Sequence, residues 1–463
     1  MFVNRLSELN LLDKSYESGK AEFFVLYGRR RVGKTELLAR FCEGKRAVFF
    51  VSDLGSEISL RAALSSAINT TIFGPGKMDA VYSSWEALFQ TLGQAAQKER
   101  LVVVLDEFPY MVAAHPPLAS ILQKSWDQTL KNSQIMLILC GSYIGMMEET
   151  VLGYQAPLYG RRTAQYLLDP LQFKDARLFF PSFPHEDQVR AYAVFGGTPA
   201  YLHTIEPDKP LKENIHENIL TRGSYLYDEV RFILQQELRE PRNYFAILQA
   251  IAAGKTRLND IKQATGLDGA TSYLDTLQQL HLIERLVPVT ETQPQKSRRG
   301  IYRLKDPYIR FWFRYVHPNR SQLERGGTHF TLENQVLPEI DHFSSLAFEE
   351  ICQQYIWQKG ISGKLPFMPE KIGRWWNTSE EVDLIVVGAK DAILVECKWS
   401  NQPVGMDILS DLERKAHVVE RELGGRNIQF ALCSRSGFTS YLIESLTRRS
   451  DTSLFDLLQI LEN

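Results

Sequence analysis

The chain has 463 residues, enough for about three domains that each bury a core. Its 53 Lys and Arg residues against 55 Asp and Glu residues give a formal net charge of −2, so any nucleic-acid contact has to come from local basic patches. No apolar run approaches the roughly 20 residues of a membrane span, and the N-terminus lacks the apolar segment of a signal peptide. We therefore expect a cytoplasmic protein without a membrane partner.

The first informative element is a phosphate-binding loop at residues 28–35. The apolar run 23–27 predicts a buried parallel strand, and the residues after it match GxxxxGK[ST] in full. Backbone N–H groups of such a loop face the phosphates, Lys34 would reach the β- and γ-phosphates, and the Thr35 hydroxyl would hold Mg²⁺. We expect nucleotide contacts from the loop and the residue after it: Gly28, Arg29, Arg30, Arg31, Val32, Gly33, Lys34, Thr35 and Glu36.

A second apolar strand, at 101–106, ends in Asp106 and is followed by Glu107. Asp106 would orient the Mg²⁺ through its water shell, and Glu107 is placed to polarise an attacking water as the general base. The order strand, loop, helix and then a strand ending in Asp-Glu predicts an ATPase that uses Mg²⁺.

Residues 1–165 are expected to form the ATPase core. Apolar strands at 23–27, 46–51, 101–106 and 135–140 alternate with helices, which predicts a parallel sheet covered on both faces. Arg161 and Arg162 follow a loop that contains Gly160, and one of them is a candidate arginine finger, in cis or across a subunit boundary of a homo-oligomer. The competing interpretation is a pair of solvated loop arginines.

Residues 166–235 are expected to be a helical lid. The turn at 196–199 reads Gly-Gly-Thr-Pro, which suits backbone that must run where no side chain fits, and Pro199 would stiffen it. Such a turn could carry the nucleotide state from the ATP site to the lid.

Residues 236–325 predict a winged helix. Helical segments at 258–264 and 270–280 are separated by a turn with Gly266, and strands around 282–289 and 300–304 would form a hairpin. From 285 to 325 there are ten Lys or Arg residues against three acids. We expect DNA contact by the second helix and the wing. The competing interpretation is a winged helix that serves only as a protein–protein spacer.

Residues 326–463 carry a second constellation of charged residues. A strand begins near Asp383, and after a short turn the next strand carries Glu396 and Lys398, which share a face because they are two positions apart. The hairpin would bring Asp383 towards Glu396, so that the two carboxylates share a divalent metal. Lys398 would then orient a water or stabilise negative charge at phosphorus.

A helix at 344–358 would supply a further carboxylate, for which we choose Glu349, with Glu350 as its neighbouring alternative. The Asp…Glu-x-Lys pattern between helices predicts a PD-(D/E)XK fold, that of restriction endonucleases. Asp383, Glu396 and Glu349 would hold Mg²⁺ or Mn²⁺ there. The competing interpretation is a degenerate nuclease fold that only binds DNA or another protein.

The five cysteines are scattered along the chain, without a CxxC pair. An odd, dispersed set in a nucleotide-binding protein is typical of reduced core thiols and not of disulfides or zinc ligands.

With these features placed, the chain resembles the archaeal-type P-loop ATPases of the AAA+/STAND assemblage that carry a winged helix and a PD-(D/E)XK-like C-terminal domain. The matching segments are 2–5 with 8–9, 27–35, 106–108, 197–199, 306–313, 373–376 and 396–399. The resemblance implies that Asn4 and Arg5 lie near the adenine, although position 4 is often glycine in that family. It also implies that Ser142 senses the γ-phosphate, while the alternative for Ser142 is a plain strand-end turn residue.

The sequence therefore predicts a multidomain α/β protein. It has a P-loop parallel-sheet core, a helical lid, a winged helix and a restriction-endonuclease-like C-terminal domain. We expect it to bind and hydrolyse ATP and to be a nucleotide-controlled DNA-binding protein with a metal-dependent nuclease-like domain. The alternative is an ATP/ADP switch of the STAND type, or a transcription regulator, whose C-terminal domain only binds partners.

Overall fold

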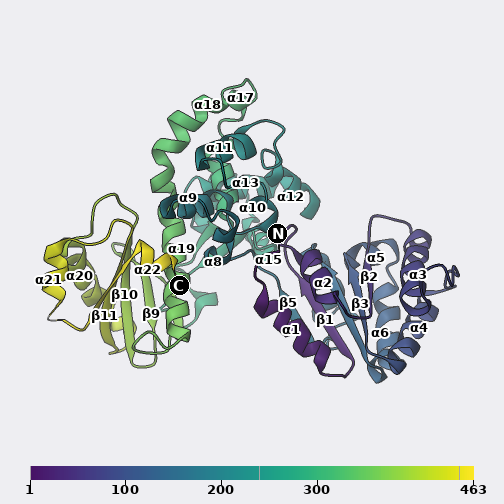
Figure 1. Ribbon diagram of the computed structural model, residues 1–463. Coiled ribbons are helices and arrows are strands. Elements are labelled where there is room, and N and C mark those ends of the chain that lie inside the picture. The colour runs from purple at the N-terminus through teal and green to yellow at the C-terminus, as the bar shows by residue number, and fades with distance from the viewer. Residues whose placement is uncertain (1, 239, 448, 463) are drawn as a thin grey trace. The chain divides into compact units, whose positions relative to one another are not determined.

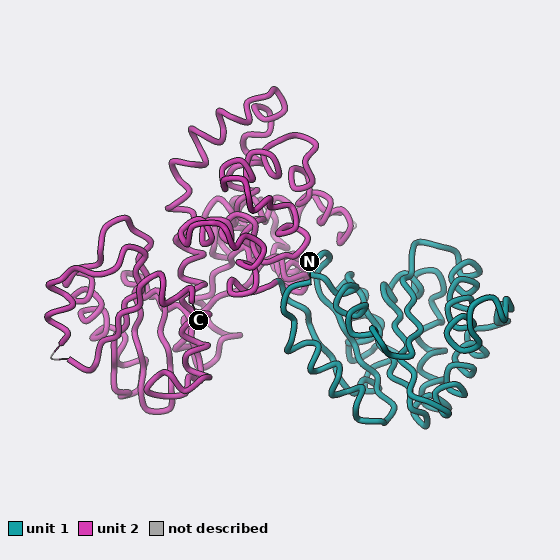
Figure 2. The backbone as a smooth tube through the Cα atoms, viewed as in Figure 1, with its two compact units in different colours: residues 1–170 teal, residues 171–463 magenta. Residues whose placement is uncertain are grey.

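The computed structural model describes residues 2–238, 240–447 and 449–462. The chain divides into two units, residues 1–170 and residues 171–463 (Figure 2). The predicted lid, winged helix and C-terminal domain thus lie almost entirely in the second unit. The boundaries between these three predicted domains stay predictions. Among the described residues, no helix combines the length and apolar character that crossing a membrane requires.

The first unit is built on a five-stranded parallel sheet in the order β2-β3-β4-β1-β5. Its β3 and β4 are buried along their whole length, as central parallel strands are. The four predicted strands are confirmed; β5 was missed because its residues are only half-buried and lack an apolar run. The strands are β1 (Glu22–Tyr27), β2 (Ala47–Val51), β3 (Leu101–Asp106), β4 (Ile135–Gly141) and β5 (Ala164–Leu167).

Helices cover both faces of this sheet (Figure 1). Successive residues of a strand point to opposite faces. Phe23 of β1 accordingly packs with α3 (Glu57–Phe73), α4 (Trp85–Lys98), α5 (Phe108–Ala114) and α6 (Leu118–Gln128), whereas Phe24 packs with α1 (Leu6–Glu17) and α2 (Lys34–Cys42). This two-sided burial fixes the sheet whose carboxyl edge carries the P-loop.

The first part of the second unit is helical. Its longer helices are α9 (His185–Phe195) and α12 (Glu229–Glu237). The shorter helical segments of both units are η1 (Leu130–Asn132), α7 (Ile144–Met147), η2 (Glu148–Leu152), α8 (Phe173–Ala176), η3 (Arg177–Phe179), α10 (Pro199–Leu202), α11 (Leu211–Ile215), η4 (His216–Leu220), η5 (Pro294–Lys296), α16 (Pro307–Phe311), η6 (Trp312–Val316), α17 (Arg320–Leu323), α18 (Thr328–Thr331), η7 (Leu332–Val336) and η8 (Leu337–Glu339).

A three-helix segment with a hairpin follows. It comprises α13 (Pro241–Ala252), α14 (Leu258–Thr265), α15 (Ala270–Gln279), β6 (Ile283–Leu286) and β7 (Ile301–Leu304). Gly266, in the left-handed conformation at φ 67°, ends α14 and makes the turn into α15. The two strands are antiparallel, and Tyr302 N donates to Thr256 O at 2.7 Å, which adds the segment before α14 to the hairpin edge.

The C-terminal part contains a mixed five-stranded sheet in the order β12-β11-β10-β9-β8. β8, β9 and β10 form an antiparallel meander, and β11 and β12 continue parallel to β10. α19 packs on one face and α20 with α21 on the other (Figure 1). The elements are α19 (Ile340–Ile361), β8 (Lys371–Trp376), β9 (Glu381–Val387), β10 (Asp391–Lys398), α20 (Met406–Leu423), β11 (Asn427–Ser434), α21 (Ser440–Leu446), β12 (Thr452–Asp456) and α22 (Leu457–Leu461).

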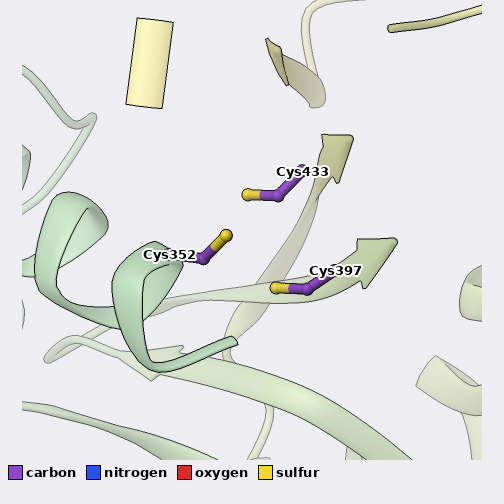
Figure 3. Close-up of side chains that lie close together, drawn as sticks. All are labelled: Cys352, Cys397 and Cys433. Atoms are coloured by element: carbon purple, nitrogen blue, oxygen red, sulfur yellow. The ribbon is translucent and has the colours of Figure 1, made fainter. Parts of the chain in front are cut away.

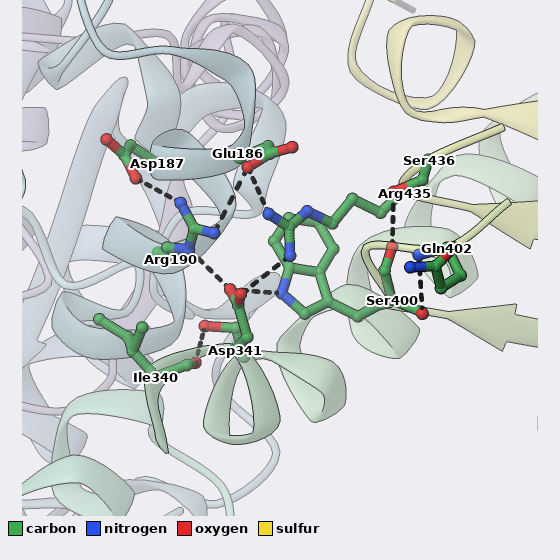
Figure 4. Close-up of polar contacts among 11 residues, drawn as sticks. Glu186, Asp187, Arg190, Ile340, Asp341, Ser400, Gln402, Arg435 and Ser436 are labelled. Atoms are coloured by element: carbon green, nitrogen blue, oxygen red, sulfur yellow. Dashed lines mark hydrogen bonds and ion pairs between the residues drawn. The ribbon is translucent and has the colours of Figure 1, made fainter. Parts of the chain in front are cut away.

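A charged network ties α9 to this sheet (Figure 4). Asp341, in the first turn of α19, accepts from Arg190 of α9 at 2.8 Å and from Arg435 at 3.0 Å. Arg435 also bonds Glu186 at 2.5 Å, and Trp399 Nε1 donates to Asp341 at 3.2 Å. Burial alone would raise the pKa of Asp341, but the two guanidinium groups outweigh it and hold that pKa below its usual value.

The turn at Gly197 is a close backbone crossing. Leu171 N donates to Gly197 O at 2.7 Å, and a Cβ on Gly197 would stand 1.8 Å from the carbonyl oxygen of Leu171. The requirement for glycine at this turn is therefore steric. The expected link from Pro199, the first residue of α10, to the ATP site stays a prediction.

Gly197→Ala should destabilise the second unit by about 1–3 kcal/mol or more, because the backbone at Leu171 cannot give way as a side chain can. The matched control is Gly269→Ala, whose Cβ would meet nothing within 4 Å. Denaturant unfolding followed by tryptophan fluorescence gives both free energies of unfolding. Equal free energies of unfolding for the two variants would contradict the steric requirement for glycine at position 197.

Candidate functional site

The first candidate site lies where β1, β3 and β4 end. Carboxyl ends of parallel strands meet at one edge of a sheet, which brings the loop after β1 beside Asp106 and Ser142. Gly33, at φ 90°, turns the loop into α2. Lys34 is buried, and its Nζ donates to the carbonyls of Gly28 and Arg29 at 2.8 and 2.9 Å and to Ser142 Oγ at 2.7 Å.

The acidic residues of this site meet the same loop. Asp106 is fully buried and accepts from Thr35 Oγ1 at 2.5 Å. Glu107, at φ 53°, accepts from the Ser142 hydroxyl at 2.5 Å and from Ser142 N at 3.2 Å. Ser142 therefore joins the P-loop lysine to Glu107. The hard oxygen donors of Thr35 and Asp106 suit Mg²⁺, and Lys34 suits a phosphate.

Arg5 has a structural place beside the loop. Its guanidinium donates to Val32 O at 3.1 Å, to Asp169 O at 2.8 Å and to Glu8 Oε1 at 3.0 Å. These bonds fasten the P-loop to the segment after β5, and they occupy the side chain. The adenine contact that the resemblance implies for Asn4 and Arg5 stays a prediction.

The remaining loop residues lie as follows. Arg30 donates to the Tyr110 hydroxyl at 2.5 Å. Arg31 is partly buried with φ 71°. Thr35 and Glu36 are exposed in the first turn of α2, where solvent and a ligand can reach them.

Arg161 and Arg162 lie at the opposite edge of the sheet from the P-loop. They precede β5, which runs parallel to β1 and begins beside Phe24, whereas the P-loop follows the end of β1. Arg161 pairs with Asp127 at 3.1 Å, near the end of α6. A position before β5 is unfavourable for a cis arginine finger, because the P-loop follows the other end of the neighbouring β1, and the finger in cis stays a prediction. A finger across a subunit boundary stays a prediction.

The second candidate site lies where β9 and β10 pair. The antiparallel register sets Leu384 against Val395, so Asp383 lies opposite Glu396, and Asp383 Oδ2 accepts from Cys397 N at 2.8 Å. Lys398 Nζ donates to Glu396 Oε1 at 2.6 Å. The structure thus brings together the three residues that the sequence analysis selected here.

Lys415 of α20 is a further member that the sequence analysis missed. Its Nζ lies 3.4 Å from Glu396 Oε2 and 3.2 Å from Asp411. The available signal is its position: Lys415 falls in the apolar stripe of α20 beside Leu412 and Val419, both buried. A lysine in that stripe is directed at the sheet. Burial opposes its charged form, but Glu396 and Asp411 outweigh that effect and raise its pKa.

The two neighbouring glutamates of α19 have different surroundings. Glu350 pairs with Arg310 and Arg303 at 3.1 and 3.3 Å, and although burial opposes ionisation, these cations keep its pKa low. Burial raises the pKa of Glu349, and the nearest cation, Arg374 Nε, lies 3.7 Å away. The negative charge of Glu349 contributes to the raised pKa of Asp383. The choice of Glu349 over Glu350 as the extra metal ligand stays a prediction.

Burial first, and then the charges of Glu396 and Glu349, raise the pKa of Asp383 to about 7. Lys398 and the amide of Cys397 oppose this shift without cancelling it. A divalent cation among these carboxylates would remove their mutual repulsion, and carboxylate oxygens are the donors that Mg²⁺ or Mn²⁺ prefers. Among the described residues, the oxygens of Asp383, Glu396 and Glu349 do not all lie within 4.8 Å of one another, so the metal site stays a prediction.

The basic stretch 285–325 carries less free charge than its composition suggests. Arg299 pairs with Glu422 of α20 at 3.1 Å, and Arg303 and Arg310 pair with acids of their own unit. Arg285 bonds the carbonyls of Pro294 and Ser297 instead of an acid. Within the described part of this stretch, the exposed Lys296, Arg298 and Arg325 have no ion pair with an acid. The second helix, α15, contains no Lys or Arg. Much of the positive charge thus fastens the hairpin to the C-terminal sheet.

Comparisons with known proteins agree with the first site. Residues 2–205 match a family model described as an ATPase domain predominantly from Archaea. Residues 312–416 match one described as archaeal and bacterial proteins of unknown function. An uncharacterised protein of Methanocaldococcus jannaschii is 36% identical over 425 residues, 90% of this chain and 92% of its own length. An uncharacterised ATP-binding protein of the same organism is 52% identical over 46 residues, 10% of this chain and 78% of its own.

Two solved structures have a partial likeness to the chain. The Walker-type ATPase of Pyrococcus abyssi has a TM-score of 0.49 at 20% identity and covers 68% of this chain and 96% of its own. The ORC2 protein of Aeropyrum pernix has a TM-score of 0.42 at 13% identity, over 69% and 94% of the two chains.

Asp383 should make stability depend on pH. Because its folded pKa is raised to about 7, the protonated carboxyl stabilises the fold fully below pH 3.8, and this stability is lost as pH rises to 7. Asp383→Asn cannot ionise, so its stability relative to the wild type should increase across that window, by ~1.4 kcal/mol for each unit of pKa displacement. Urea unfolding at several pH values, with EDTA present, measures the difference. A difference independent of pH would contradict the raised pKa.

Proposed function

This chain belongs to a family of archaeal-type P-loop ATPases, and we propose that it uses ATP to control a metal-dependent, nuclease-like site in its second unit. The ATPase domain accounts for residues 2–205. The proposal therefore concerns which residues carry out hydrolysis and what the second unit does.

For the ATP site we assign roles from the contacts around Ser142. Lys34 binds the β- and γ-phosphates, Thr35 and Asp106 hold Mg²⁺, and Glu107 removes a proton from the attacking water. Bound Mg²⁺ supplies charge neutralisation of the phosphates. Ser142 bonds both Lys34 and Glu107, so a γ-phosphate that engages Lys34 would alter the hydrogen bonding of Glu107. This coupling supports a sensor role for Ser142.

For the second unit, one observation carries the proposal: Asp383 opposite Glu396, with Lys398 bonded to Glu396 at 2.6 Å. The order α19-β8-β9-β10-α20-β11, an antiparallel meander followed by a helix and a parallel strand, supports the PD-(D/E)XK assignment. Glu349 adds a carboxylate from the preceding helix. A divalent cation held by Asp383, Glu396 and Glu349 would supply Lewis acidity at a phosphodiester, while Lys398 orients the water and Lys415 offers positive charge.

The preferred substrate class is DNA, bound mainly through the C-terminal sheet domain. The helix–turn–helix segment and the hairpin support a winged helix. DNA binding by this segment would need cations that neutralise phosphates, but α15 carries no Lys or Arg and Arg299 is paired with Glu422. These two observations instead favour the spacer interpretation of the winged helix. They also favour the second candidate function, a nucleotide switch whose C-terminal domain only binds partners. DNA-stimulated ATP hydrolysis supports the first function, and tightly held ADP with DNA-independent exchange supports the second.

Lys34→Ala should abolish nucleotide binding, because it removes the cation at the phosphates. Glu107→Gln should keep binding but lower turnover by ~10²–10⁴-fold, because the amide cannot accept the proton. Calorimetry and a phosphate-release assay measure the two properties. Glu43→Gln, on an exposed residue at the end of α2, is the control expected to retain wild-type values. Wild-type turnover by Glu107→Gln would show that another residue is the base.

The wild type should cleave single- or double-stranded DNA in Mn²⁺, tested with and without ATP. Asp383→Asn and Lys398→Ala should lower the rate by at least ~10²-fold, because each removes part of the charge arrangement at phosphorus. Asp391→Asn is the matched control at the other end of β10, where the Asp391 side chain accepts from Asn427 Nδ2 at 3.2 Å across the strands. Equal cleavage by the control and by Asp383→Asn would reveal a contaminating nuclease. Absence of cleavage and of Mn²⁺ binding would leave the second unit a binding module.

A further inference from the structure

Three of the five cysteines meet in the core of the second unit, although the sequence scatters them. Cys352 comes from α19, Cys397 from β10 and Cys433 from β11. All three are buried, and their sulfur atoms lie within 4.8 Å of one another and point into one space (Figure 3). The parallel register of β10 and β11 sets Cys397 directly beside Cys433. The thiols are free, as the sequence analysis expects, but they are not dispersed in space.

This arrangement is that of a ligand set for a soft metal ion. Thiolates select Cu⁺ and Zn²⁺ over the hard cations that carboxylates prefer. An ion about 2.3 Å from each of three sulfurs places the sulfurs at most about 4 Å apart. The sulfur atoms lie within 4.8 Å of one another. Small side-chain rotations that move each sulfur by a few tenths of an ångström would shorten these separations to about 4 Å. The set comes from three separate elements, so a common ion would join a helix and two strands at one point.

A buried polar atom on the same helix as Cys352 lacks a partner among the described residues. Tyr355 lies one turn beyond Cys352 on α19 and is 6% exposed. Its hydroxyl is buried and makes no hydrogen bond within the described part of the chain. Buried hydroxyls normally find a partner. A metal-bound water or a fourth ligand contact beside Cys352 would satisfy this atom, which three neutral thiols do not.

We propose that Cys352, Cys397 and Cys433 bind one thiophilic metal ion, Zn²⁺ or Cu⁺, which clamps α19 to β10 and β11. This site is separate from the carboxylates. Glu396 and Lys398 point to one face of β10, whereas Cys397 points to the other, towards α19. The clamp would hold α19, the helix that carries Glu349 three positions before Cys352. The proposal does not depend on cleavage activity.

The test uses the full chain purified without chelator from cells supplied with zinc and copper, then analysed by inductively coupled plasma mass spectrometry. The wild type should contain about one zinc or copper ion per chain, and the element found identifies the ion. The apo protein, prepared with a chelator under reducing conditions, should take up Co²⁺ or Cu⁺ with a thiolate-to-metal charge-transfer band.

Cys352→Ser, Cys397→Ser and Cys433→Ser should each lower the bound metal at least tenfold and remove the band. Cys42→Ser, on a half-buried cysteine of the first unit, should keep both. Circular dichroism of the apo wild type and of each variant separates loss of ligand from loss of fold. The wild-type measurement needs no variant, so misfolding of a variant cannot obscure a negative result. A wild type that holds no zinc or copper and gives no band with Co²⁺ or Cu⁺ would overturn the proposal.

Discussion

Carboxylates forced together on the sheet of the second unit are the constraint on which the rest of that unit depends. Asp383 and Glu396 face each other across paired strands, and Glu349 approaches from α19. Like charges withdrawn from water repel, and the raised pKa of Asp383 expresses that cost. Such an arrangement persists only where surrounding structure holds it. α19 is the element that does so, because Asp341 and Glu350 pair with Arg435 and Arg310. Its Cys352 also lies within 4.8 Å of the sulfurs of Cys397 and Cys433.

In the first unit, the parallel sheet positions the residues of the ATP site. The sheet is buried on both faces, and the P-loop, Asp106 and Ser142 lie at one edge of it. The stability of the fold comes from the apolar residues of the two faces and not from these polar groups. Ser142 lies between Lys34 and Glu107 and bonds both. A phosphate that draws the Lys34 ammonium group away from Ser142 would therefore change the hydrogen bond that Ser142 donates to Glu107, the proposed base. This gives a physical route by which nucleotide state and hydrolysis are coupled within one unit.

The sequence predicts those parts of the sites that depend on local spacing. The P-loop, the strand ending in Asp106 and the Glu396-x-Lys398 face follow from strand and loop periodicity, and all lie as expected. Features set by tertiary packing were missed or are not decided by local spacing. Arg161 is next to a glycine loop in sequence but at the far edge of the sheet, because β5 runs parallel to β1. Lys415 and the three-cysteine cluster draw their partners from distant segments. The apolar stripe of α20 indicates that Lys415 faces the sheet but not which carboxylate it meets, and the scattered cysteines carry no local pattern.

The central claim is that the carboxylates of the second unit are a metal site. Anomalous diffraction from crystals of the full chain soaked in Mn²⁺ with a non-hydrolysable ATP analogue tests it most directly. Two anomalous peaks are predicted, one beside Thr35 and Asp106 and one between Asp383 and Glu396. The first peak is an internal control for soaking. Density for Mn²⁺ at the P-loop alone, with none between Asp383 and Glu396, would contradict the account.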